Sequence, residues 1–163
     1  MKEELLLEKS AKSLTKDNIA DLQQKLHLEL PDQFVEFYLK HNGGVPSRAY
    51  FFYNKNDEII EISVFFPLLY KREGSSDDTI EDRYLSLTGR KILPLECFPF
   101  AKDWGGNLFC LNLLTQEVLF VLLDMGPISE KSFLPIALSF DTFINSLMTE
   151  EEAEEAGEDE EDS

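Results

Sequence analysis

Residues 107–124 read NLFCLNLLTQEVLFVLLD, two apolar runs separated by a short turn. The runs NLFCLNL and EVLFVLLD are rich in aliphatic and aromatic side chains, a composition that favours strands. The residues LTQ between them are too few for a crossover connection, so the two strands should form a hairpin and run antiparallel. We therefore predict that this stretch is part of a largely antiparallel sheet.

Three segments upstream extend the predicted sheet. Residues 49–54 (AYFFYN) and 58–68 (EIIEISVFFPL) have the composition of strands, with NKND between them as a turn. In the second segment, acidic residues and a serine interrupt the apolar pattern, so one face of the sheet should be partly exposed to water. Residues 92–100 (ILPLECFPF) are a third candidate, and their prolines predict an edge strand or a bent one.

Two helices are predicted before these strands. Residues 15–26 place apolar side chains at helical spacing, and Thr15 or Asp17 can cap the start. The segment LPDQFVEFYLKHNGG, residues 30–44, has Pro31 where a first helical turn would begin and a missing N–H costs nothing. The NGG triplet should end this helix, because glycine accepts the left-handed conformation found there.

Two further helices are predicted, and together the elements indicate a fold class. Residues 75–89 (SSDDTIEDRYLSLTG) form one helix, which Asp78 can cap and Gly89 can end, and residues 138–148 (LSFDTFINSLM) form the other. Helices cluster towards the two ends of the chain, and short turns link the strands. We therefore predict an α+β domain over residues 1–149, with a mostly antiparallel sheet flanked by N-terminal and C-terminal helices.

The charge of the chain is concentrated at its end. The net charge is −17, and residues 150–163 contain ten acids and no base. Such a segment buries little apolar surface, so we predict an acidic disordered tail over 150–163. The acidic balance argues against nucleic-acid binding, which needs a basic footprint. Two interpretations of the tail stay open, attraction of a basic protein partner and a solvating segment that aids solubility. The N-terminus lacks signal-peptide character and no segment has the ~20 apolar residues of a membrane span, which favours a cytoplasmic protein that does not bind membranes.

The sequence lacks the usual signatures of catalysis and metal binding. No phosphate loop, dinucleotide fingerprint, nucleophile elbow or HExxH motif is present. Cys97 and Cys110 lie in apolar runs and are interpreted as buried free thiols. His27 and His41 end or follow predicted helices, which is an adequate structural reason for both. We therefore predict no enzyme activity, no cofactor and no metal.

Neighbouring carboxylates also have a structural explanation. Asp77 with Asp78, and Glu81 with Asp82, could be imagined as catalytic pairs. The first turn of a helix favours acidic residues in any case, so we interpret both pairs as helix-start residues.

The stretch FAKDWGGN, just before the hairpin, is the main candidate for a binding site. Gly105 and Gly106 allow positive φ or close backbone approach, and Asp103 and Asn107 can hold a corner by local hydrogen bonds. Trp104 is then either a core plug or an exposed anchor for a partner. Two interpretations stay open, a structural corner and a partner-binding loop, and we take Asp103, Trp104 and Asn107 as the candidate contact residues.

Several motifs in order resemble the SUKH superfamily, which includes the yeast cell-wall synthesis regulator and many bacterial toxin-immunity proteins. The motifs are LPDQFVEFYLKHNGG, FFPL, LPLECFPFAKDWGGNLFCLNL, EVLFVLLD and PIALSFDTFINSL, and they cover roughly residues 15 to 148. The residues that fall on the family pattern or its turn are Leu30, Pro31, Asn42, Gly43, Gly44, Phe100, Ala101, Asp103, Gly105, Gly106, Asn107, Ser139, Phe140 and Phe143.

The resemblance implies an α+β fold, motif residues with structural roles, and no enzyme activity. It implies a protein-binding module, either a bacterial immunity protein that neutralises a cognate toxin by direct binding or a regulatory scaffold without a toxin. The expected partner of the first is a basic toxin domain such as a nuclease. Its partner surface is not marked by the family pattern.

Overall fold

The computed structural model describes residues 4–53, 58–123 and 127–161. In chain order the elements are β1 (Leu7–Glu8), α1 (Lys16–Leu26), α2 (Asp32–Lys40), β2 (Val45–Pro46), β3 (Tyr50–Tyr53), β4 (Glu58–Phe65), α3 (Ile80–Gly89), β5 (Cys97–Asp103), β6 (Leu108–Asn112), β7 (Val118–Val121), the 3-10 turn η1 (Glu130–Ser132), β8 (Phe133–Ala137), α4 (Phe140–Ser146) and α5 (Glu150–Glu161). The predicted NKND turn lies outside the described residues.

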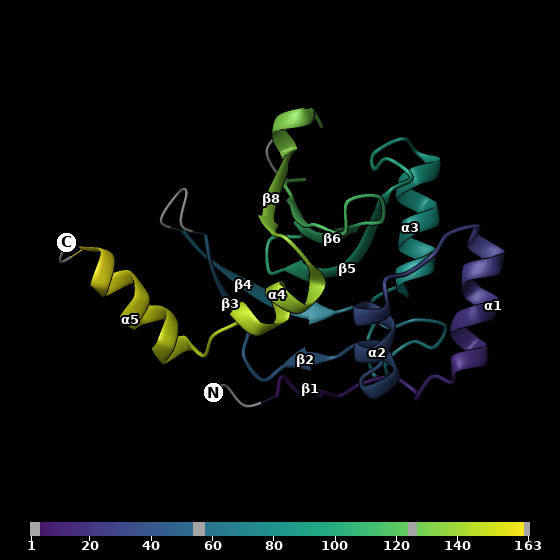
Figure 1. Cartoon of the computed structure of the whole chain (residues 1–163), viewed down its shortest axis with the longest axis horizontal. Coiled ribbons are helices and arrows are strands. Elements are labelled where there is room, and N and C mark those ends of the chain that lie inside the picture. Colours follow the sequence, from purple (N-terminus) through teal and green to yellow (C-terminus); the bar gives the residue numbers. More distant parts are fainter. Residues whose placement is uncertain (1–3, 54–57, 124–126, 162–163) are drawn as a thin grey trace.

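Six strands form one sheet in the order β3-β4-β5-β6-β7-β8, and each pairs antiparallel with its neighbours (Figure 1). The β6–β7 hairpin places Leu108 opposite Val121 and Leu111 opposite Val118. A separate small sheet pairs β1 with β2. The predicted α+β class with a mostly antiparallel sheet is therefore confirmed.

Strand β5 lies inside the sheet although it contains Pro99. It pairs with β4 on one side and β6 on the other, so the edge-strand alternative is wrong. The pairing with β6 shifts register between Pro99 and Ala101, which leaves Phe100 as an extra residue. A bulge of this kind accommodates a proline within a sheet, because the ladder is already interrupted there.

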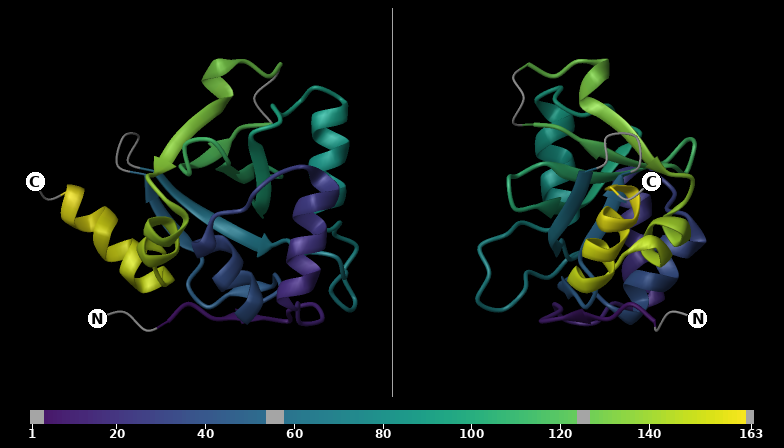
Figure 2. Two further views of the ribbon diagram at one scale, coloured as in Figure 1. Left: turned by 45° about the vertical axis from the view of Figure 1, so that its right-hand side comes forward. Right: turned by 90° about the vertical axis from the view of Figure 1, so that its left-hand side faces the viewer.

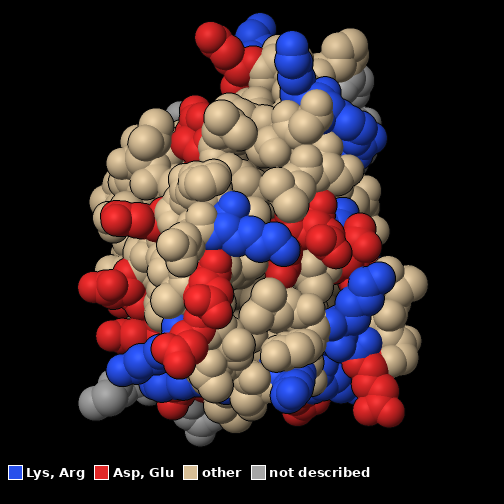
Figure 3. All heavy atoms as spheres, turned by 90° about the vertical axis from the view of Figure 1, so that its right-hand side faces the viewer, with Lys and Arg blue, Asp and Glu red and all other residues tan. Residues whose placement is uncertain are grey.

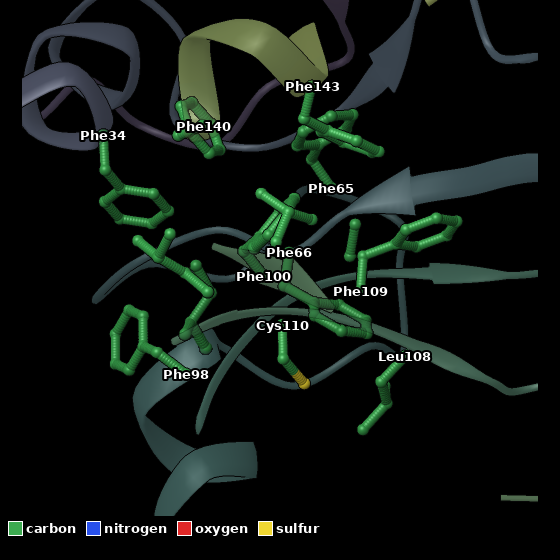
Figure 4. Packing of buried hydrophobic residues seen from close by; sticks show 14 of the residues in the cluster. Phe34, Phe65, Phe66, Phe98, Phe100, Leu108, Phe109, Cys110, Phe140 and Phe143 are labelled. Carbon is green, nitrogen blue, oxygen red and sulfur yellow. The ribbon is translucent and has the colours of Figure 1, made fainter. Parts of the chain in front are cut away.

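Phenylalanine side chains fill the core between the sheet and the helices on one of its faces (Figure 4). Phe34 of α2 and Phe140 of α4 pack edge-on at 5.1 Å, and Phe140 lies 5.3 Å from Phe100 of β5 between ring centroids. Edge-to-face contacts at these distances add to the stabilisation from apolar burial. Figure 4 also shows Leu108 and Cys110 pointing to the opposite side of the sheet, away from α4.

Both cysteines are buried free thiols, as the sequence predicts. Burial, with the charge of Glu96, raises the pKa of Cys97 to about 12. Burial also raises the pKa of Cys110 well above its ordinary value. Both thiols therefore stay protonated and behave as small apolar core residues.

The helix boundaries follow the capping residues, with one correction. Thr15 caps α1 and forms a capping box with Asn18. Pro31 occupies the N-cap of α2, just before its first turn. Helix α3 is capped by Thr79, whose side chain accepts from the backbone N–H of Asp82, and not by Asp78. Threonine is also a favoured N-cap residue, and the helix begins one residue later than predicted.

The NGG triplet after α2 joins three parts of the chain. Asn42 is buried, and its amide Nδ2 donates to the carbonyl oxygens of Lys12 at 2.8 Å and Leu68 at 2.9 Å. Its Oδ1 accepts from the N–H of Leu68 at 2.7 Å. Gly43 and Gly44 have φ of +74° and +126°, and their backbone passes against neighbouring main chain where no Cβ would fit.

The end of the chain differs from the predicted disordered tail. Residues Glu150–Glu161 form helix α5, which lies beside β3 (Figures 1 and 2). Thr149 and Glu152 hydrogen-bond each other's backbone N–H groups, and Ala153 is only 2% exposed. A capping box, acids in the first turn and a small apolar anchor favour a helix here, and charge alone did not reveal them.

Candidate functional site

The turn between β5 and β6 is held by two polar side chains. The Oδ1 atom of Asp103 accepts from the N–H groups of Gly105 at 2.9 Å and Asn107 at 2.8 Å, and its Oδ2 accepts from Asn107 Nδ2 at 3.0 Å. Asn107 Oδ1 accepts from the N–H of Leu123 at 2.8 Å. The turn is therefore fixed to the sheet at two points, and its tip has little freedom.

One glycine in the turn needs its conformational freedom. Gly106 has φ of +90°, a region that side chains with a Cβ rarely adopt, and no heavy atom lies within 4 Å of the position that its Cβ would take. Gly105 is exposed and has an ordinary φ. Of the two glycines that could take positive φ or a close backbone approach, Gly106 takes positive φ.

Trp104 lies at the tip of this turn and is 73% exposed. Its indole N–H donates to Oε2 of Glu61, on the neighbouring strand β4. The ring is therefore oriented by its edge while most of its surface faces solvent. An exposed, oriented aromatic side chain is typical of an anchor for a protein partner.

Glu61 also connects Trp104 to strand β3. Tyr50 lies directly opposite Glu61 in the sheet. The hydrogen bond with Glu61 is the largest cause that raises the pKa of Tyr50 to about 12, followed by burial and by the negative charges of Glu61, Glu150 and Glu154. The Glu61 carboxylate is thus held between two aromatic donors, and the start of α5 adds negative charge nearby.

An open hollow of about 330 Å³ lies beside the indole ring. We call it the Trp104 hollow. Its lining residues are Glu58, Ile59, Ile60, Glu61, Asp103, Trp104, Gly105, Asn107, Phe120 and Leu122. Ile59 is 43% exposed, so an apolar patch is continuous with the acidic groups. The mixture suits a protein side chain that has an apolar stem and a charged end.

The structure brings the three predicted contact residues together but separates their roles. Asp103, Trp104 and Asn107 all belong to one turn, yet Asn107 is 6% exposed and Asp103 uses both carboxylate oxygens within the turn. Of the three, Trp104 alone directs a large side chain to solvent. The hydrogen bonds support the structural interpretation of the turn, and the partner-binding interpretation stays a prediction that now rests on Trp104.

The sequence analysis missed Glu61 and Tyr50 as neighbours of Trp104. The acidic interruption of the second strand was noticed, but its partner depends on the register between β3, β4 and β5. Alternation assigns each residue to a face of the sheet but does not exclude a shift by two residues, and the β4–β5 register also shifts between Ile62 and Val64.

The carboxylates considered as catalytic pairs are engaged elsewhere. Burial alone would raise the pKa of Asp77, but the hydrogen bond and charge of Lys102, with Ser75 and Arg72, hold it below its ordinary value. Glu81 accepts from the N–H of Leu69 with both oxygens, at 2.9 and 3.2 Å. Both side chains therefore stabilise loops next to α3.

The described residues form neither a metal site nor a membrane-spanning helix. Among the described residues, no group of three histidine, cysteine, aspartate or glutamate side chains is placed to hold a metal ion. His27 and His41 occupy the C-caps of α1 and α2, as interpreted from the sequence. Within the described part of the chain, no helix combines the length and apolar character that crossing a bilayer requires.

The charge around the Trp104 hollow differs from that on another face. Figure 3 shows lysine and arginine side chains lying among aspartate and glutamate side chains over the side that α1 and α3 form. The described residues that line the Trp104 hollow include three acids and no base. The described lining of the hollow therefore carries charge of one sign.

Comparison with known proteins supports the resemblance drawn from the sequence. A family model described as SMI1 / KNR4 family (SUKH-1) matches residues 13–146. The chain is also similar to the SPbeta prophage-derived uncharacterized protein YokK of Bacillus subtilis (strain 168), with 27% identity over 151 residues, 83% of this chain and 76% of that protein. The family match covers the six-stranded sheet and α1 to α4 and stops before α5.

Proposed function

The chain belongs to the SMI1 / KNR4 family (SUKH-1), and from this premise we propose that it is a non-enzymatic protein-binding module. Its finer role in this proposal is that of a bacterial immunity protein, which binds and neutralises a cognate toxin in the cytoplasm. The similarity to a prophage-derived bacterial protein supports the bacterial form of this role.

The observation that carries the proposal is the exposure of Trp104. The side chain is 73% exposed, although the turn beneath it is fixed by four hydrogen bonds. The exposed ring does not contribute the stabilisation that burial of an aromatic side chain would give. Such an arrangement is favourable when a partner covers the ring, because little ordering remains to be done on binding.

The acidic balance supports a basic partner. The chain carries a net charge of −17, and α5 places acidic residues beside the sheet edge near Tyr50. Complementary charge raises the rate of association and makes it dependent on salt. A toxin domain with a basic surface, such as a nuclease, fits this chemistry.

A growth-rescue experiment tests the proposal. The gene immediately upstream is expressed in a sensitive host, with and without the full chain, and with a Trp104→Ala variant. A toxic neighbour that the chain neutralises, with weaker rescue by Trp104→Ala, supports the proposal. A Glu29→Gln variant, in an exposed glutamate after α1, serves as a control that should rescue fully. A toxic neighbour without rescue, or a harmless one, contradicts the immunity role.

A regulatory scaffold is the second candidate, and a second hollow favours it. Glu4, Gln33, Glu36, Lys40 and Asp141 are among the residues that line a hollow of about 170 Å³ between the N-terminal segment, α2 and α4. A scaffold would bind two proteins at once through the two hollows. Affinity capture with the full chain should then recover two proteins in one complex, one lost with Trp104→Ala and the other with Glu36→Lys.

A further inference from the structure

We infer that the Trp104 hollow receives an arginine side chain from a basic segment of the partner protein. In this arrangement the guanidinium stacks on the exposed face of the indole ring and hydrogen-bonds the carboxylate of Glu61. The inference deepens the proposed function and rests on it for the identity of the partner as a protein.

The indole ring is available as a platform. Its N–H is used by Glu61, so the ring is held by one edge and cannot turn freely. Trp104 is 73% exposed, so much of the ring surface remains open to a ligand. Tryptophan is the aromatic side chain that attracts cations most strongly to its face.

The Glu61 carboxylate is placed to receive the charge. It accepts from Trp104 Nε1 and from the hydroxyl of Tyr50, the cross-strand partner. An ionised carboxylate can accept about four hydrogen bonds, so two acceptor positions stay open to a ligand. Because the two aromatic donors fix its orientation, it loses little freedom when a cation binds.

The surroundings select a cation with an apolar stem. Glu58 and Glu61 lie in the hollow, and Glu150 and Glu154 are close enough to raise the pKa of Tyr50. The exposed side of Ile59 offers an apolar surface beside them. The volume of about 330 Å³ is at the low end for small-molecule pockets, and the hollow is open, which suits one side chain of a larger partner.

Arginine fits this site better than lysine. Its guanidinium is planar, stacks on aromatic rings and presents several donors in a fixed fork. A lysine ammonium would gain the charge attraction but would stay more strongly hydrated and could not stack. The site should therefore bind arginine more tightly than lysine, and either cation more tightly than a neutral analogue of the same shape.

The single tryptophan makes the test direct, because intrinsic fluorescence of the full chain reports on this site alone. Short blocked glycine peptides with arginine, lysine or citrulline at the centre are titrated up to about 10 mM, a concentration that saturates even a ~1 mM site. The arginine peptide should shift the emission of Trp104 saturably. Lysine should bind about threefold more weakly and citrulline, which has the same shape without the charge, should not bind.

Two variants separate recognition from structure. Glu61→Gln keeps an oxygen to accept from the indole N–H, so the emission of the free protein should not change, but the arginine peptide should bind about fivefold more weakly. Glu29→Gln makes the same chemical change at a residue outside the Trp104 hollow, and this variant should bind the arginine peptide as the parent protein does. Equal binding of arginine and citrulline, or unaltered binding by Glu61→Gln, would overturn the inference.

The peptide titration and the growth rescue fail independently. If the parent protein rescues growth and the arginine peptide causes no saturable shift, the arginine site is refuted while the immunity role stands. If the peptide series behaves as described and no neighbouring toxin is neutralised, the immunity role is refuted while the arginine site stands.

Discussion

Replacing Asn42 with alanine should destabilise the protein strongly. The amide makes three hydrogen bonds, two with the backbone of Leu68 in a buried setting and one with the carbonyl of Lys12 in a partly buried one. Removing a partner from a buried polar group costs about 1–3 kcal/mol, and a partly buried bond contributes about 0.5–1.5 kcal/mol. The two buried groups and the third bond together predict a loss of roughly 3–5 kcal/mol in the free energy of unfolding.

Urea unfolding followed by far-ultraviolet circular dichroism measures this loss. With a denaturant slope of about 2 kcal/mol per molar, the midpoint should fall by roughly 2 M. Asn112→Ala is the matched control, since Asn112 also accepts two backbone hydrogen bonds, but in an exposed turn. Water can replace those bonds, so its midpoint should fall by less than about 0.5 M.

Comparable shifts for the two alanine variants would refute the reasoning. That result would mean that burial does not determine how much stability is lost when an asparagine is removed. It would also mean that Asn42 does not stabilise the packing of the segment after α2 against the segment after β4. A change in slope instead of midpoint would also count against it, because it would indicate an altered denatured state.

Three further predictions follow from single contacts. Gly44→Ala should lower the free energy of unfolding by more than about 2 kcal/mol, because φ is +126° and the new Cβ would lie 2.3 Å from a carbonyl oxygen of β1. Gly106→Ala should lower it by about 1 kcal/mol, since only its φ is unfavourable. Equal losses for the two variants in urea unfolding would contradict this. The pKa of Tyr50 is raised from 10.0 to about 12, so the stabilisation linked to it is present below pH 10 and is lost as pH rises towards 12. Glu61→Gln should lower this pKa. A spectroscopic titration of tyrosinate measures the change, with Tyr50→Phe as the reference that lacks the Tyr50 signal. Ala153→Asp should release α5 from the sheet edge and speed cleavage by a glutamate-specific protease, and unchanged cleavage would show that the buried alanine is not its anchor.

The sequence predicted the elements whose residues satisfy local rules. The β6–β7 hairpin has strong strand composition on both sides of a short connection, which spans residues 113–117 instead of the predicted LTQ alone. Thr15 and the periodic apolar residues of α1 indicated the start and the buried face of that helix. Strand β5 was recognised but misplaced. Pro99 argues for an edge, and only the register shift with β6 explains how a proline is tolerated inside the sheet.

The unpredicted parts depend on contacts between distant residues. Strand β8 contains Pro135 and has no fully buried residue, so its composition does not distinguish it from a loop, and it is a strand because β7 pairs with it. The acidic composition of residues 150–161 did not predict helix α5. Ala153 is buried only because β3 lies beside the helix, and the sequence does not show that contact. The position of Glu61 beside the indole N–H likewise follows from cross-strand register.

The same distinction separates the residues of the family pattern from the proposed binding surface. Asn42, Asp103 and Asn107 fall on the pattern. The side chain of each hydrogen-bonds the backbone or another residue of its own turn. Trp104, between two of them in sequence, contributes its ring to solvent. Variants of the first kind should therefore lose stability yet retain affinity for a partner under conditions where they stay folded. Variants of Trp104 should lose affinity with little loss of stability, because a side chain that is 73% exposed contributes little to the core. If Trp104→Ala unfolds as readily as Asn42→Ala, the turn serves the fold alone and the binding surface lies elsewhere.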